Sequence, residues 1–64
     1  MSNITDIELI NRFISWCIDR DFNQSDMARV LKRTKQWASL LVHGKINRLQ
    51  FDTRNRIKSI LGIQ

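Results

Sequence analysis

The scarcity of residues that interrupt helices constrains this fold most. Proline is absent from the 64 residues, and glycine occurs only as Gly44 and Gly62. Apolar residues recur at steps of three and four, the spacing that places side chains on one face of a helix. In residues 7–18 this spacing predicts one apolar stripe, formed by Ile7, Ile10, Phe13, Ile14, Cys17 and Ile18. The sequence therefore predicts helices joined by short polar turns, because a sheet would need more turn residues.

Residues that cap helices divide the chain into four helical segments. Thr5, Asn23 and Thr34 each precede a predicted helix, and each offers a side-chain oxygen to its free amide groups. Gly44 is the residue type favoured just after a helix end. The predicted helices cover about four turns around residues 7–18, then residues 24–31, 35–43 and 51–61. The side chains expected to face the core from the last three helices are Met27, Ala28, Val30, Leu31, Ala38, Leu41, Phe51, Ile57, Ile60 and Leu61.

The chain length predicts one small domain, residues 1–64. A domain of this size buries only about 60% of the surface that the unfolded chain exposes, so each large apolar side chain matters. The expected fold class is all-α, a small bundle of four to five helices.

Several classes of protein and site are excluded by the composition. Cys17 and His43 are the only cysteine and the only histidine, whereas an internal disulfide needs two cysteines and structural zinc about four ligands. We expect no metal, no cofactor and no catalytic residue, since no activated nucleophile or phosphate-binding glycine loop is evident. Apolar runs fall far short of the roughly 20 residues of a membrane helix, and no signal peptide is evident. The expected location is the cytoplasm.

Positive charge is concentrated in the last two-thirds of the chain. Residues 1–22 contain four acidic and two basic side chains, a net charge of −2. Residues 23–64 contain nine basic and two acidic side chains, a net charge of +7. Such an imbalance indicates a polyanionic partner. The alternative is a charged surface that serves only solubility.

The second and third predicted helices are short and separated by three polar residues, the arrangement of a helix-turn-helix over about residues 24–43. Four stretches, 23–31, 34–39, 43–45 and 57–63, resemble the DNA-binding domain of phage repressors and Cro-type regulators. This is the lambda-repressor-like family, also called Cro/C1 or xenobiotic-response-element type. The resemblance covers about residues 10–63. It implies a transcriptional regulator that binds double-stranded DNA, in a bacterial or phage-infected cell at the nucleoid.

The resemblance also implies which residues contact DNA. The helix at 35–43 would lie in the major groove as the recognition helix. The residues expected to contact base edges are Lys35, Gln36, Ser39, Leu40 and His43. The residues expected to contact phosphates are Gln24, Thr34, Lys45, Asn47 and Arg48.

The sequence departs from the family at three positions. Lys32 stands where the turn usually has glycine, so its backbone would be left-handed at a cost of about 1 kcal/mol. Arg33 occupies a place that is usually apolar, and Trp37 one that is usually small or polar. We expect the fifth helix that many relatives use for dimerisation to be missing, so a homodimer would use apolar residues of the last helix, such as Ile60 and Ile63.

An interaction protein with the same fold is the alternative function. It would act as a modulator or antirepressor by binding another transcriptional regulator. The apolar residues Trp37, Leu40 and Trp16 would then form the partner surface. For Trp37, packing on the flank of the core is the competing explanation, and Trp16 could equally cover an edge of the core.

Overall fold

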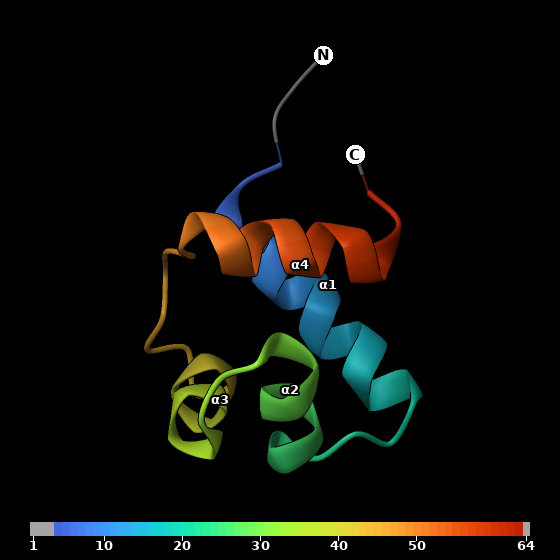
Figure 1. The fold of residues 1–64 in the computed structure, drawn as a ribbon, viewed down its shortest axis with the longest axis vertical. Coiled ribbons are helices and arrows are strands. Elements are labelled where there is room, and N and C mark those ends of the chain that lie inside the picture. Colours follow the sequence, from blue (N-terminus) through green and yellow to red (C-terminus); the bar gives the residue numbers. More distant parts are fainter. Residues whose placement is uncertain (1–3, 64) are drawn as a thin grey trace.

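The structure is a computed structural model that describes residues 4–63, and four helices account for most of them. The helices are α1 (Asp6–Asp19), α2 (Gln24–Leu31), α3 (Lys35–Val42) and α4 (Phe51–Leu61) (Figure 1). Residues 4–63 contain no strand. The all-helical prediction is confirmed, and α2 and α4 have the predicted bounds. Helix α3 ends one residue earlier than predicted, because His43 forms its C-cap.

The predicted capping residues begin the first three helices. Thr5 and Thr34 each accept a hydrogen bond, 3.1 Å long, from the amide three residues further on. Asn23 and Asp26 form a reciprocal pair, in which each side chain accepts from the other's backbone amide, at 2.9 and 3.2 Å. These bonds satisfy amide groups that have no partner inside the helix, which fixes where each helix starts.

The helices pack mainly two by two, α1 with α4 and α2 with α3 (Figure 1). Ala28 and Ala38 are both buried, so the backbones of α2 and α3 can approach closely. The core lies where the two pairs meet. Its members are Leu9, Ile10, Phe13, Cys17, Met27, Ala28, Leu31, Ala38, Leu41 and Ile57.

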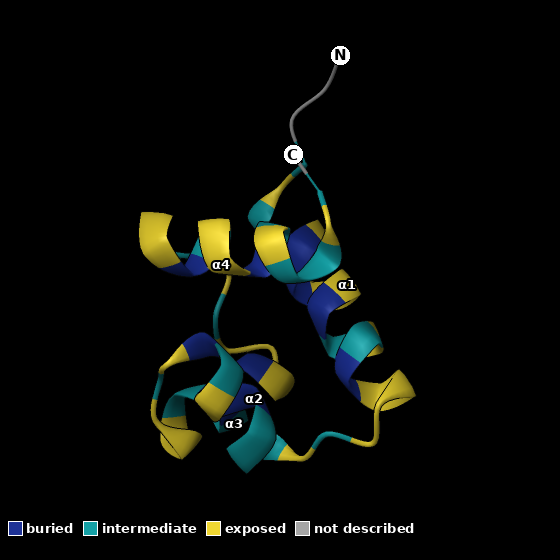
Figure 2. Cartoon of the chain, turned by 45° about the vertical axis from the view of Figure 1, so that its right-hand side comes forward, coloured by how far each residue is buried: buried dark blue, intermediate teal, exposed yellow. Residues whose placement is uncertain are grey.

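The predicted inner face of α1 is partly wrong. Ile7 and Ile18 are 56% and 64% exposed, whereas Leu9, outside the predicted stripe, is fully buried. The apolar surface of α1 is wider than the core it meets, and the core covers the side on which Leu9 and Phe13 lie. Exposed residues therefore run along the outer side of α1 (Figure 2).

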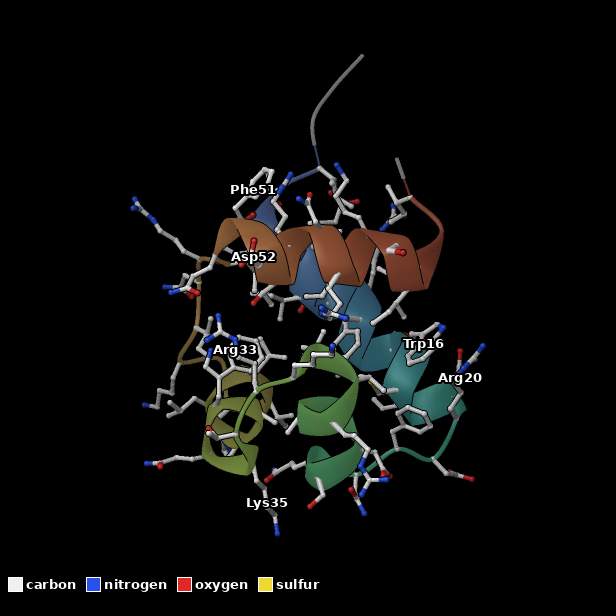
Figure 3. The ribbon with its side chains drawn as sticks, viewed as in Figure 1. Trp16, Arg20, Arg33, Lys35, Phe51 and Asp52 are labelled. Carbon is white, nitrogen blue, oxygen red and sulfur yellow. The ribbon has the colours of Figure 1, made fainter. Side chains whose placement is uncertain are left out.

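The prediction that Phe51 faces the core is also wrong. Phe51 is 76% exposed and lies at the start of α4 (Figure 3). Thr53, two residues later and about 200° further around the helix, takes the inward position and is buried with Ile57.

The two tryptophans both pack against the core. Trp16 stacks on Phe13, with 6.0 Å between ring centroids, and meets Phe22 edge-on at 5.4 Å. The Arg20 guanidinium lies 4.2 Å from the Trp16 ring centroid. Trp37 is half-buried on the core flank, where Arg33 lies against it. No helix in residues 4–63 combines the length and the apolar character needed to cross a membrane.

Lys32 has the left-handed backbone that its place in the turn predicts, with φ 56° and ψ 44°. Its amide donates to the carbonyl of Arg29, and the Arg33 amide donates to Ala28, at 3.2 and 2.8 Å. These two bonds end α2 and turn the chain toward α3. A left-handed conformation is unfavourable for a side chain with a Cβ atom.

Replacing Lys32 by glycine should therefore stabilise the protein. Glycine adopts this conformation without strain, which favours the folded state of Lys32→Gly. Glycine also has greater conformational freedom in the unfolded chain, which offsets part of this gain. The net increase in the free energy of unfolding should be about 0.5–1 kcal/mol. Urea unfolding followed by tryptophan fluorescence measures the change. Lys32→Ala is the matched control, because it also removes the charge but keeps the Cβ atom. Equal stabilisation by both variants would show that the charge, and not the backbone, carries the cost.

Candidate nucleic-acid interface

One side of α3 faces away from the core. Ala38 and Leu41 anchor the opposite side in the core, at 0% and 1% exposure. At 100° per residue, four side chains lie roughly opposite these anchors. They are Gln36, Ser39, Leu40 and His43, of which Ser39 is half-buried and the others are exposed. The structure thus brings four of the five predicted base-contacting residues onto one face, which we call the α3 face.

Lys35, the fifth of these residues, lies apart from the α3 face. Its side chain lines a shallow hollow of about 450 Å³ together with Gln24, Ser25 and Val42. Figure 3 shows Lys35 at the far end of α3 from α4. The structure therefore groups Lys35 with Gln24 at the start of α2, among the predicted phosphate-contacting residues.

His43 has one ring nitrogen committed to the backbone. Its Nδ1 lies 2.7 Å from the carbonyl oxygen of Ser39. Because a carbonyl oxygen only accepts, Nδ1 carries the hydrogen and donates it. This leaves Nε2 as the nitrogen for a ligand, where it accepts a hydrogen bond when the ring is neutral and donates one when the ring is protonated.

The segment between α3 and α4 carries the predicted basic residues outward. Ile46 and Leu49 are half-buried and pack against the core. Their neighbours in sequence, Lys45, Asn47 and Arg48, are exposed. The two apolar residues therefore anchor the segment, and its polar and basic side chains remain available to a partner.

Asp6 holds this segment in place from the far end of the chain. Its Oδ2 accepts from the Leu49 amide at 3.0 Å, and its Oδ1 pairs with Arg54. Arg54 also donates to the Ile4 carbonyl at 2.6 Å. The pKa of Asp6 is lowered, mainly because the Leu49 amide donates a hydrogen bond to its carboxylate. Burial acts in the opposite direction and raises the pKa, whereas the hydrogen bond and the positive charge of Arg54 lower it further. The sequence predicted none of this, since Asp6 shows only the pattern of a first-turn acidic residue.

Arg33 connects the α2–α3 turn to α4. Its Nε and Nη2 donate to Thr53 Oγ1 at 3.2 and 2.9 Å, and Nη2 also donates to Gln50 Oε1 at 2.8 Å. The guanidinium carbon lies 5.1 Å from the Trp37 ring centroid. The one available signal was that arginine stands where the resemblance leads us to expect an apolar residue.

The remaining predicted residues divide into free and engaged side chains. Thr34 caps α3 as an acceptor, which leaves its own hydroxyl hydrogen for a phosphate. Both Trp16 and Trp37, predicted as partner surface, already have intramolecular neighbours. Leu40 is the exposed member of that set.

Cys17 is fully buried, and burial raises the pKa of its thiol to about 11, so the thiolate is scarce at neutral pH.

Stability should depend on pH through Asp6. Because the pKa of Asp6 is lowered in the folded state, its contribution is present above the ordinary aspartate pKa of about 4 and is lost as pH falls through the folded value. Asp6→Asn should reduce the free energy of unfolding by about 1.5–3 kcal/mol at pH 7, the size expected for hydrogen bonds to a charged group. The difference from the unsubstituted protein should shrink as the pH falls through the lowered pKa of Asp6 in the folded state.

Urea unfolding of both proteins from about pH 2.5 to pH 7 measures this difference. Other carboxyl groups titrate in both, so subtraction isolates Asp6. A difference that stays constant over this range would mean that the amide disturbs packing, and would contradict a role for the charge.

The site offers hydrogen-bonding and basic side chains around an exposed helix. No family model, curated protein or solved structure matches the chain. The function is therefore inferred from α3 and the segment that follows it.

Proposed function

We propose that this chain is a small DNA-binding transcriptional regulator of the helix-turn-helix, lambda-repressor-like type. The observation that supports the proposal is the α3 face, a polar surface held opposite a buried anchor and followed by an exposed basic segment. An α-helix with such a face fits the major groove of B-DNA. The proposed site of action is the nucleoid of a bacterial or phage-infected cell.

The α3 face would supply the contacts that depend on DNA sequence. Gln36 can pair with both acceptor and donor of adenine, and Leu40 can contact a thymine methyl group. Ser39 can donate or accept, and His43 can accept from an amino group through Nε2 when neutral. Each good pair of hydrogen bonds contributes about 1–3 kcal/mol of discrimination between base pairs.

The surrounding basic residues would supply affinity that does not depend on sequence. Lys45 and Arg48 stand on the segment after α3, and Lys35 stands beside Gln24 on the other side of the helix. Thr34 and the first amides of α3 lie next to Lys35 at the start of the helix. Phosphate contacts on both sides of a helix would fix its position in the groove.

A second candidate function is binding to another regulator protein. The exposure of Leu40, at 43%, is the observation that favours it, because a large aliphatic side chain on a polar helix face is a common anchor in protein interfaces. This modulator or antirepressor would use the same α3 face without DNA.

DNA binding can be tested by fluorescence anisotropy with a pool of random-sequence duplexes, followed by sequencing of the bound fraction. We expect one enriched motif and an affinity that falls with salt by a log–log slope of about −0.9 per phosphate contacted. Gln36→Ala should weaken binding to the enriched duplex about 5- to 150-fold, with little effect on an unrelated duplex. Lys45→Ala should weaken both and reduce the slope by about one phosphate.

Arg12→Gln is the matched control for Lys45→Ala. Arg12 is an exposed residue of α1 that pairs with Glu8 at 2.9 Å, so the variant removes one positive charge far from α3 in sequence. Equal losses in the two variants would show that only net charge matters. Absence of binding at low salt would overturn the DNA proposal and leave the protein-binding candidate, which Leu40→Ser would then test against captured regulators.

A further inference from the structure

A groove with an apolar end and a basic rim lies between α2 and α4. Two adjoining hollows, of about 650 and 250 Å³, share Asp52 and Arg56 in their walls and so form one groove. Val30 and Ile60, both half-buried, line its wider part. Lys32 and Arg33 line the narrower part, where Figure 3 shows Arg33 below Asp52. Three basic residues against one acidic residue give this groove a positive charge.

Helix α1 carries a surface of the opposite charge. The exposed Ile7 and Ile18 are eleven residues apart, which is three turns, so they lie within about 20° of one line and about 16 Å apart. A carboxylate follows each of them, Glu8 and Asp19, both exposed. Glu8 pairs with Arg12 at 2.9 Å on the same side of the helix, so Asp19 supplies the net negative charge of this surface. We call these four residues the acidic stripe. Within residues 4–63, Asp19 forms no ion pair.

We propose that the acidic stripe of one copy of this chain docks into the α2–α4 groove of a second copy. An isoleucine of the stripe would fill the apolar end, between Val30 and Ile60, and the carboxylate beside it would meet Arg56. Both surfaces leave apolar side chains in water in the monomer, and their charges are complementary. This inference does not depend on DNA binding, since neither surface includes the α3 face or the proposed phosphate-contacting residues Lys45, Asn47 and Arg48.

A symmetric pairing of α1 with α1 is disfavoured by the same charges. In an antiparallel pair that matches Ile7 with Ile18 of the second copy, Glu8 comes within about two residues of the second copy's Asp19. Like charges at that distance repel each other. Docking through two different surfaces instead leaves one stripe and one groove unoccupied at the ends, so the contact can repeat and form head-to-tail chains of copies.

Sedimentation equilibrium of the full chain without DNA tests the proposal. At about 50 mM salt and protein concentrations up to about 1 mM, the average mass should rise above the 7.6 kDa of one chain and continue past a dimer. At about 500 mM salt it should fall back toward the monomer, because screening weakens the charge contacts.

Two neutralised variants identify the surfaces. Glu8→Gln/Asp19→Asn removes the charges of the stripe, and Lys32→Gln/Arg56→Gln removes two charges of the groove. Each should weaken self-association at least about tenfold. Asp21→Asn and Arg29→Gln are the controls, because they remove charges of the same sign from exposed positions outside both surfaces. Circular dichroism of every variant checks that the helices remain folded.

Mixing the two neutralised variants gives the decisive result. Each retains one intact surface, so the mixture should form a 1:1 complex of about 15 kDa, twice one chain, and nothing larger. A mixture as monomeric as its components would overturn the proposal. Three other results would also overturn it. The unsubstituted protein could stop at a dimer or stay monomeric at every concentration, or the control variants could weaken self-association as much as the neutralised variants.

Discussion

The orientation of α3 depends on the hydrogen bonds of Arg33. The fold consists of two helix pairs that meet in one apolar core, and α2 and α4 approach each other closely at only a few places. Arg33 adds a polar connection between them, because its guanidinium donates to Thr53 of α4 and to Gln50, the N-cap of that helix, and covers the ring of Trp37 on α3. Guanidinium groups suit this place, since their planar donors can serve two acceptors while the face lies on an aromatic ring. An apolar residue here could pack but could not satisfy the buried Thr53.

A second polar contact has the same role for the segment after α3. Asp6, in the first turn of α1, meets the backbone of Leu49 and the side chain of Arg54. The Asp6 and Arg54 side chains are only about a quarter exposed, so water screens their charges less than at the open surface. A chain of 64 residues has little core with which to hold the eight-residue connection between α3 and α4. These hydrogen bonds, together with the packing of Ile46 and Leu49, hold the connection in place. Its basic side chains, Lys45 and Arg48, remain exposed.

The sequence predicted local structure well because local causes determine it. Thr5, Asn23 and Thr34 cap helices through residues only three positions away, and the spacing of Ala38 and Leu41 identifies the inner side of α3. The errors occur where a helix is apolar on more sides than the core can cover. Ile7, Ile18 and Phe51 follow the helical spacing but lie outside the contact area, which depends on how the helices cross. The contacts of Arg33 and Asp6 span 17 to 48 residues, and no local pattern reports them.

In the structure, the unevenly distributed charges of the sequence lie on separate surfaces. Five of the nine positive residues in 23–64 lie in two places, Lys45 and Arg48 on the segment after α3 and Lys32, Arg33 and Arg56 along the groove between α2 and α4. Three of the four negative residues in 1–22, Asp6, Glu8 and Asp19, lie on α1. A DNA duplex at the α3 face would repel the acidic stripe, which therefore must lie away from the phosphates. Docking of that stripe into the groove of a second copy would neutralise basic side chains that lie outside the proposed DNA-binding surface. The two proposed associations would then reinforce each other, since a copy held at a neighbouring site is present at a high effective concentration. A module too small to bind DNA tightly alone could gain its affinity in this way.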